Sequence, residues 1–311
     1  MINFCNQDSK EIWTLEKINS TAKSDPEYLV NSVENRFNQV IEKVIDYVLN
    51  EKRESKLILV SGPSSSGKTT FAKILLERLN QKGILSEVFP FDNFYLGIDK
   101  VPVLPDGSKD FEAIDSLDIE NIKKCLSTLI TEGECIIPTY DFAKMAPAKE
   151  KQYLKNPKGG IVLAEGLHAI NPLLTEGIRP EHVVKIYVDI NSGIKHKDKV
   201  FYPPKYLRLA RRVLRDYIYR GTLSLQTLDM WNNILRGEKL YIRPIRRHAE
   251  VLVDTLHEFE PCVMKNETLK LFEDLPAEVK VNFTKFMKHL DAFNEIKKDL
   301  IPTDSLIREF I

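Results

Sequence analysis

The sequence predicts an α/β protein with a mainly parallel sheet flanked by helices. Short apolar runs typical of buried strands recur along the chain, at residues 57–60, 87–91, 161–164 and 185–190. Segments whose apolar residues have helical spacing lie between them. Alternation of this kind is typical of a parallel sheet, whose ligands bind beyond the carboxyl ends of the strands.

A turn rich in glycine and serine follows the first run. Residues 57–70 read LILVSGPSSSGKTT and contain G-x-x-x-x-G-K-[ST], the pattern of a phosphate-binding P-loop. Glycine lets the backbone approach phosphates without a Cβ, and the N–H groups form an anion nest at the start of a helix. A chance match is the alternative, but the strand before it and the helical FAKILLERLN after it argue for a true site. The expected nucleotide-binding residues are Gly62, Pro63, Ser64, Ser65, Ser66, Gly67, Lys68, Thr69 and Thr70.

The composition gives no indication of a nucleic-acid, membrane or zinc partner. The 311 residues include 45 Lys+Arg and 45 Asp+Glu, a balance that gives no reason to expect nucleic acid or a membrane. No apolar run approaches the roughly 20 residues that span a bilayer, and the N-terminus does not resemble a secretory signal. The four scattered cysteines argue against a disulfide framework or a zinc site. We expect a cytoplasmic protein acting on a small molecule, with homo-oligomerisation left open.

Three parts of the chain are predicted. Residues 1–50 form a leader, polar and featureless to residue 25, followed by an amphipathic helix at 28–49 that packs on the rest of the chain or docks a partner. Residues 51–265 form the P-loop domain, and residues 266–311 form a helical extension packed on it, with an extended tail. Within the domain we expect a short strand at 135–137, an exposed flap at 143–159 and a flexible connection at 191–206.

Three oxygen-bearing side chains follow predicted strands. Thr69, Asp92 and Glu165 each come just after the end of one. In a parallel sheet these ends lie at one edge, so the three side chains should converge. This predicts a magnesium-dependent site rather than passive nucleotide binding.

An arginine-rich helix is predicted at RLARRVLRDYIYRG. Arg208, Arg211, Arg212 and Arg215 share one helical face, and Arg220 follows. A solvated basic face is the ordinary interpretation of such a run. Because a phosphate site is predicted elsewhere, a lid that clamps phosphates is favoured.

Together these segments resemble the uridine kinase/phosphoribulokinase family of P-loop kinases, particularly the bacterial uridine kinase-like nucleoside kinases. The resemblance covers about residues 40–311. It includes SGPSSSGKTTFAK, DNFY, DFEAIDSLD, PTYDF, AEGLHAINPLL, RLARRVLRDYIYRG, W-x-x-x-x-x-GEKLYI-x-P and IPTDSLIREFI.

The resemblance implies transfer of phosphate from ATP or GTP, with Mg²⁺, to the 5′-hydroxyl of a ribonucleoside. It implies that Asp92 accepts the hydroxyl proton near the metal and that Glu165 holds metal-bound water or substrate. Lys68, Arg212 and Arg215 would be catalytic, with Arg208 and Arg220 also on the nucleotide. Asp110 would contact the ribose, and the nucleoside pocket would be lined by Tyr95, Tyr140 and Phe142. A helix cap for Asp92, a turn for Asp110 and core packing for the aromatic residues are the structural alternatives.

The sequence departs from the family pattern at three places. Met145 and Pro147 stand where a His and an Arg read the pyrimidine, Tyr206 replaces an acid before the first lid arginine, and Ile245-Arg246-Arg247 replaces Phe-Gln-Glu. A different acceptor, including a phosphorylated or acidic one, is therefore a hypothesis. The alternatives are a phosphoribulokinase- or pantothenate kinase-like enzyme, or an ATP-binding sensor with weak or no kinase activity.

Overall fold

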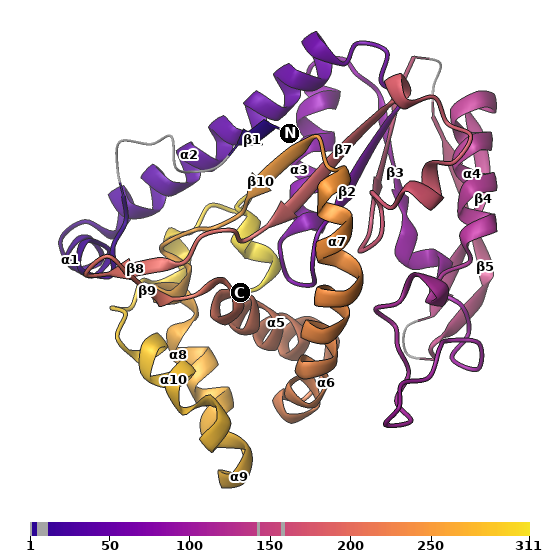
Figure 1. Ribbon diagram of the computed structural model, residues 1–311. Coiled ribbons are helices and arrows are strands. Elements are labelled where there is room, and N and C mark those ends of the chain that lie inside the picture. The colour runs from indigo at the N-terminus through magenta and orange to yellow at the C-terminus, as the bar shows by residue number, and fades with distance from the viewer. Residues whose placement is uncertain (1, 5–11, 142–143, 157–158) are drawn as a thin grey trace.

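The computed structural model describes residues 2–4, 12–141, 144–156 and 159–311. At its centre is a six-stranded sheet in the order β1-β10-β7-β2-β6-β3, and every neighbouring pair is parallel. Its strands are β1 (Ile2–Phe4), β2 (Leu57–Ser61), β3 (Ser86–Pro90), β6 (Ile161–Glu165), β7 (Val183–Asp189) and β10 (Val251–Asp254). The predicted mainly parallel sheet is confirmed, and the P-loop follows a strand in its interior (Figure 1).

Helices cover both faces of the sheet. Along β2, Ile58 and Val60 join one hydrophobic core and Leu57 and Leu59 join the other. The first core contains α2 (Pro26–Asp46), α3 (Lys68–Gln81) and α8 (Glu260–Glu273), and the second contains α4 (Ile119–Glu132) and residues 242–249. Strands buried on both faces require apolar residues at every position, which explains the continuous apolar runs in the sequence.

Residues 1–25, for which the sequence analysis made no prediction, contribute a strand and a helix in their described parts. Ile2–Phe4 pairs in parallel with β10, and α1 (Leu15–Ser24) buries Leu15, Ile18 and Ala22. A strand of three residues is too short to show a period in the sequence. Its pairing with β10 is what reveals it in the structure. The apolar face of α2, including Val33 and Phe37, is buried in the first core. The protein itself therefore covers the face that was considered for docking a partner.

Two hairpins replace segments predicted as irregular. β4 (Glu134–Asp141) and β5 (Ala146–Lys155) form an antiparallel pair outside the main sheet, so residues 146–155 of the expected flap are a strand. β8 (Ile194–His196) and β9 (Lys199–Tyr202) form a second pair within the expected flexible connection. Most of β5 is exposed and charged, so its sequence lacks the apolar alternation that marks a half-buried strand.

The remaining helices form a layer beyond one end of the strands (Figure 1). They are α5 (Pro204–Arg220), α6 (Ser224–Gly237), α9 (Ala277–Lys280) and α10 (Thr284–Asp291), whereas the short α7 (Arg243–Ile245) belongs to the second core. Helix α8 runs across the predicted boundary at residue 265. Residues 301–311, here called the tail, return to the middle of the molecule and bury Leu306, Ile307 and Phe310. Within the described residues, no helix combines the length and apolarity that crossing a membrane requires.

Candidate active site

The P-loop has the backbone that its glycines predict. A Cβ at Gly62 would lie 1.9 Å from the carbonyl oxygen of Val188, so only glycine fits between β2 and β7. Ser65 and Gly67 have left-handed φ angles of 60° and 85°. Left-handed residues turn successive N–H groups inward, and α3 begins directly afterwards at Lys68. The loop is therefore shaped as an anion-binding nest at a helix N-terminus.

Thr69 and Glu165 meet at the carboxyl edge of the sheet. The Thr69 hydroxyl donates a hydrogen bond to Glu165 Oε2 over 3.3 Å. Burial raises the pKa of Glu165 to about 7, with Asp92 and Glu309 adding to the rise and Lys68 opposing it. Asp92 lies in the 3-10 turn Phe91–Phe94 that follows β3. The structure thus brings together Lys68, Thr69, Asp92 and Glu165, as their places at strand ends predicted.

This group offers oxygen ligands of the kind that Mg²⁺ prefers. In the part of the chain that the structure describes, no three His, Cys, Asp or Glu side chains converge closely enough to hold a metal by themselves. A magnesium ion usually binds one or two protein oxygens together with water and substrate phosphates. Thr69, Asp92 and Glu165 fit that pattern, in which the ion would enter with the nucleotide.

Two arginines of the predicted lid helix α5 pair with buried acids of the protein. Arg208 is buried, contacts Glu238 over 2.6 Å, and donates from Nε to the Ser64 carbonyl over 3.0 Å. Arg211 is fully buried and pairs with Glu260 over 2.6 Å. Both guanidinium groups have protein partners, so these two arginines brace the P-loop and the core. The shared helical face in the sequence does not reveal these pairings.

The next arginines surround one carboxylate. Arg212, Arg215 and Arg220 all contact Asp216, at 3.3, 3.2 and 3.1 Å. Arg212 also donates to the Ser64 hydroxyl over 2.6 Å. Burial lowers the pKa of Arg212 to about 10, with Arg215 adding to the decrease and Asp216 opposing it. One carboxylate leaves this group with excess positive charge beside the P-loop, which suits a phosphate chain.

The predicted acceptor residues include aromatic side chains grouped around Tyr95. The rings of Tyr95 and Tyr140 are 5.8 Å apart, and those of Tyr95 and Phe111 are 6.0 Å apart. Asp110 is buried and accepts hydrogen bonds from Arg236 at 2.8 Å and Tyr241 at 2.9 Å. Phe142, the remaining predicted pocket residue, lies outside the described residues.

Glu112, which the sequence analysis did not single out, lies near the P-loop lysine and the arginines of α5. Burial raises its pKa to about 7, while Arg212, Lys68 and Arg208 oppose the rise. A Cβ at Gly237 would lie 2.3 Å from Glu112 Cβ, so glycine makes room for this side chain. The motif DFEAIDSLD contains several acids with nothing in their spacing to distinguish them. Only the fold shows that Asp110 accepts hydrogen bonds from Arg236 and Tyr241. Glu112 instead interacts electrostatically with Lys68 and Arg212.

The three sequence departures occupy different settings. Met145 is 43% exposed, and its carbonyl accepts from the Ile98 N–H over 3.0 Å, so the β4–β5 hairpin lies against the loop after Tyr95. Tyr206 packs between the rings of Tyr202 and Phe286, at 5.6 and 5.3 Å. An aromatic contact with the helical layer therefore stands where the family pattern predicts an acid.

The Ile245-Arg246-Arg247 segment is the third departure. Arg246 lies over the Tyr187 ring at 5.7 Å, and Arg247 is exposed. The guanidinium group of Arg246 thus packs on a strand of the sheet, whereas Arg247 points away from the protein interior.

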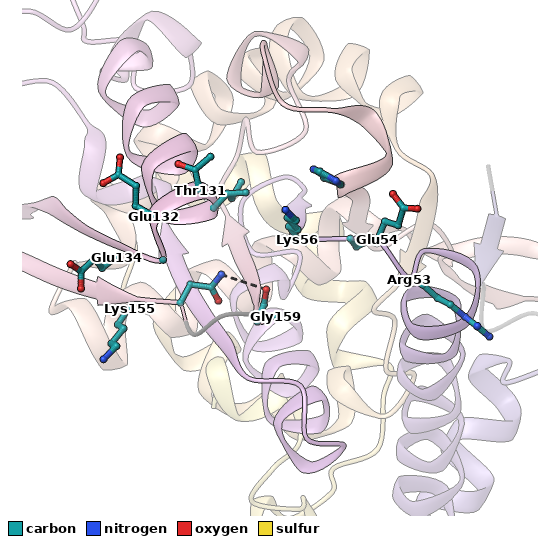
Figure 2. A pocket seen from close by; sticks show the side chains of 14 residues that line it. Arg53, Glu54, Lys56, Thr131, Glu132, Glu134, Lys155 and Gly159 are labelled. Carbon is teal, nitrogen blue, oxygen red and sulfur yellow. Dashed lines mark hydrogen bonds between the residues drawn. The ribbon is translucent and has the colours of Figure 1, made fainter.

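A separate hollow of about 740 Å³ lies at the opposite end of the sheet (Figure 2). It is lined by residues that precede strands, including Lys56 before β2 and Gly160 before β6, and by the start of β4 at Glu134. Among the lining residues, the Asn156 side chain donates to the Gly160 carbonyl over 3.4 Å. Because the P-loop follows β2, this hollow is not part of the candidate active site.

A P-loop after an interior strand of a parallel sheet, an oxygen-rich strand edge and an arginine lid define a P-loop nucleotide-binding protein of the kinase type. A sequence model described as the phosphoribulokinase/uridine kinase family matches residues 57–260, and the chain belongs to this family.

Curated relatives are similar at low identity. The chain is 28% identical to "Uridine-cytidine kinase B" of Dictyostelium discoideum over 198 residues, covering 63% of this chain and 73% of the relative. It is 25% identical to "Uridine kinase" of Ligilactobacillus salivarius (strain UCC118), covering 66% and 87%. The match to "Uridine kinase-like protein 5" of Arabidopsis thaliana is 25% identical and covers 63% of this chain, but only 38% of that relative's length.

One similar solved structure is titled "Structure of a Possible Uridine Kinase from Bacillus stearothermophilus". It is 20% identical with a TM-score of 0.48, and the superposition covers 69% of this chain and 97% of that one.

Proposed function

We propose that the protein transfers a phosphoryl group from ATP, with Mg²⁺, to the 5′-hydroxyl of a ribonucleoside. The contact between Thr69 and Glu165 at 3.3 Å carries this proposal. This contact joins the P-loop to Glu165 at the end of β6, and the nearby charge of Asp92 contributes to the raised pKa of Glu165. A protein that only binds nucleotide needs the nest, but it does not need carboxylates grouped beside it.

Each residue has a role that follows from its surroundings. The P-loop amides and Lys68 hold the outer phosphates, and Arg212 and Arg215 neutralise charge that develops during transfer. Magnesium, when bound, supplies further neutralisation of the phosphate oxygens. Asp92 orients the acceptor hydroxyl and accepts its proton. Because the transition state is loose, positioning and electrostatics contribute more than basicity.

The acceptor side favours a neutral, hydroxyl-rich molecule. Glu112 and Asp92 present acidic oxygens there, and the charge of Arg236 is already matched by Asp110 at 2.8 Å. Carboxylates accept hydrogen bonds from sugar hydroxyls and repel an anionic acceptor. These charges support a nucleoside over the phosphorylated or acidic acceptor that the three sequence departures together suggested as an alternative.

The reaction is tested by measuring ADP release from Mg·ATP with a panel of ribonucleosides, ribulose 5-phosphate and pantothenate. We expect turnover with at least one ribonucleoside and none with ribulose 5-phosphate. Turnover only with the phosphorylated sugar or with pantothenate would contradict the assigned acceptor. Tight ATP binding with no turnover on any acceptor would favour a nucleotide sensor instead.

A further inference from the structure

The tail lies directly on the P-loop. Leu306 is fully buried, and a Cβ at Gly67 would lie 2.8 Å from Leu306 Cδ2. The tail therefore contacts the loop at the residue that precedes α3. None of the roles proposed above uses this contact.

Glu309 bridges the P-loop helix and the lid. Its Oε2 accepts a hydrogen bond from the Thr70 hydroxyl over 2.5 Å, and its Oε1 lies 3.7 Å from Nη1 of Arg215. Thr70 is in the first turn of α3, and Arg215 is on α5. An acidic oxygen between a P-loop hydroxyl and a lid guanidinium occupies the kind of position that a phosphate oxygen takes in a nucleotide complex.

Other contacts hold the tail in place. The Tyr219 hydroxyl donates to the backbone oxygens of Arg308 and Ile311 over 3.3 and 2.8 Å. The guanidinium of Arg211 lies 5.0 Å from the Phe310 ring centroid. Since this packing fixes the backbone around residue 309, its side chain can rotate off Thr70 and Arg215 without the tail leaving the core.

The negative charge of Glu309 should weaken anion binding at the P-loop. The Glu309 carboxylate contributes to the raised pKa of Glu165. The negative charge of Glu309 therefore acts on groups at the carboxyl edge of the sheet. A fixed negative charge beside an anion nest weakens the attraction for another anion, and its contacts with Thr70 and Arg215 must be broken first. Both effects lower the affinity for an anion at this place.

We propose that Glu309 is an internal competitor of the nucleotide phosphates, a tail carboxylate that occupies Thr70 and Arg215 until a nucleotide displaces it. This inference rests on the proposed nucleotide-binding function. It assigns the tail a role in setting nucleotide affinity.

The test measures dissociation constants of Mg·ADP and Mg·ATP by titration calorimetry for the full chain. Glu309→Gln keeps the side-chain size and removes the charge, so we expect about two- to fivefold tighter binding than wild type, the range for a partly exposed ion pair. The difference should shrink at high salt, which screens the removed charge. Asp304→Asn is the matched control, because Asp304 is an exposed acid of the same tail, and its affinity should equal wild type.

A second variant separates competition from mere structure. In an Arg215→Ala background, Glu309→Gln should tighten binding less, because one of the two contested partners is gone. Equal or weaker binding by Glu309→Gln in the wild-type background, or equal tightening by Asp304→Asn, would overturn the competitor role. A wild-type chain that binds neither nucleotide would instead contradict the proposed function itself, and this inference with it.

Discussion

The hydroxyl of Thr69 lies 3.3 Å from Glu165 Oε2, and this contact joins the first turn of α3 to the carboxyl end of β6. Strands β2 and β6 are neighbours, with Val60 opposite Glu165 in their register. The pairing of two strands therefore sets the distance between the P-loop and an acidic side chain. The Thr69 hydroxyl thus donates to a buried carboxyl group at the edge of the sheet.

Gly62→Ala should abolish nucleotide binding and lower the melting temperature. The new Cβ would lie 1.9 Å from the Val188 carbonyl oxygen, and backbone cannot move aside cheaply. Gly107→Ala is the control, because nothing lies within 4 Å of its Cβ and only its φ of 83° is strained, at a cost of about 1 kcal/mol. Thermal melts and ADP titrations would check both variants, and retained ADP binding by Gly62→Ala would contradict this account of the loop.

Arg211→Met should destabilise the protein by about 3–5 kcal/mol, because it leaves Glu260 buried without its partner. The pair is fully inaccessible to solvent. Arg212→Met should cost much less stability, since Asp216 keeps Arg215 and Arg220, yet it should lower kcat. Denaturant unfolding and turnover would compare them. Equal stability losses would contradict the division of the helix into bracing and clamping arginines.

Glu112→Gln should make the stability of the ligand-free protein less dependent on pH. Burial raises the pKa of Glu112 from 4.5 to about 7, so the folded protein keeps a proton that the unfolded chain has lost over that interval. The contribution to stability is greatest below pH 4.5, falls as the pH rises to about 7 and is constant above it. At pH 8 the variant should melt roughly 2–6 °C higher than wild type, and at pH 4.5 the two should agree. Melting curves across this range test it, and a parallel offset at all pH values would refute it.

Acceptor binding should depend on Glu112 more than on Asp110. Asp110 already accepts from Arg236 and Tyr241, so Asp110→Asn should mainly affect stability. Glu112→Ala should raise the KM for the acceptor about tenfold while leaving the KM for ATP within about twofold, the equivalent of losing one charged hydrogen bond. Initial-rate kinetics with each substrate varied would show which residue matters. A larger acceptor effect from Asp110→Asn would instead support the assignment of Asp110 to the acceptor that the resemblance implies.

The sequence predicted the parallel sheet because β2, β6 and β7 are buried on both faces and their apolar runs are continuous. The strand ends then placed Thr69, Asp92 and Glu165 correctly at one edge. By contrast, β1 is too short to show a period, and β5 is too charged. Pairing with a distant partner defines both of these strands, and no local pattern records it.

The residues near the candidate site that the sequence analysis did not single out are those whose placement depends on tertiary neighbours. Glu112 differs from Asp110 only in what surrounds it. Glu309 follows Thr70 by more than two hundred positions in the chain, and only the fold of the tail makes them adjacent. Likewise, the arginines of α5 share one helical face in the sequence. Only the fold shows that Arg208 pairs with buried Glu238 and Arg211 with buried Glu260.

We propose that Asp92 acts in transfer and that the P-loop holds the nucleotide independently of it. Asp92→Asn keeps the size of the side chain and removes the carboxylate, with Asp99→Asn, at an exposed position, as the control. The measurement is Mg·ATP-dependent ADP release with the best acceptor, alongside ADP affinity by titration. We predict that Asp92→Asn lowers kcat at least about a hundredfold with ADP affinity near that of wild type, while Asp99→Asn behaves as wild type. Retention of most activity by Asp92→Asn would contradict the catalytic assignment.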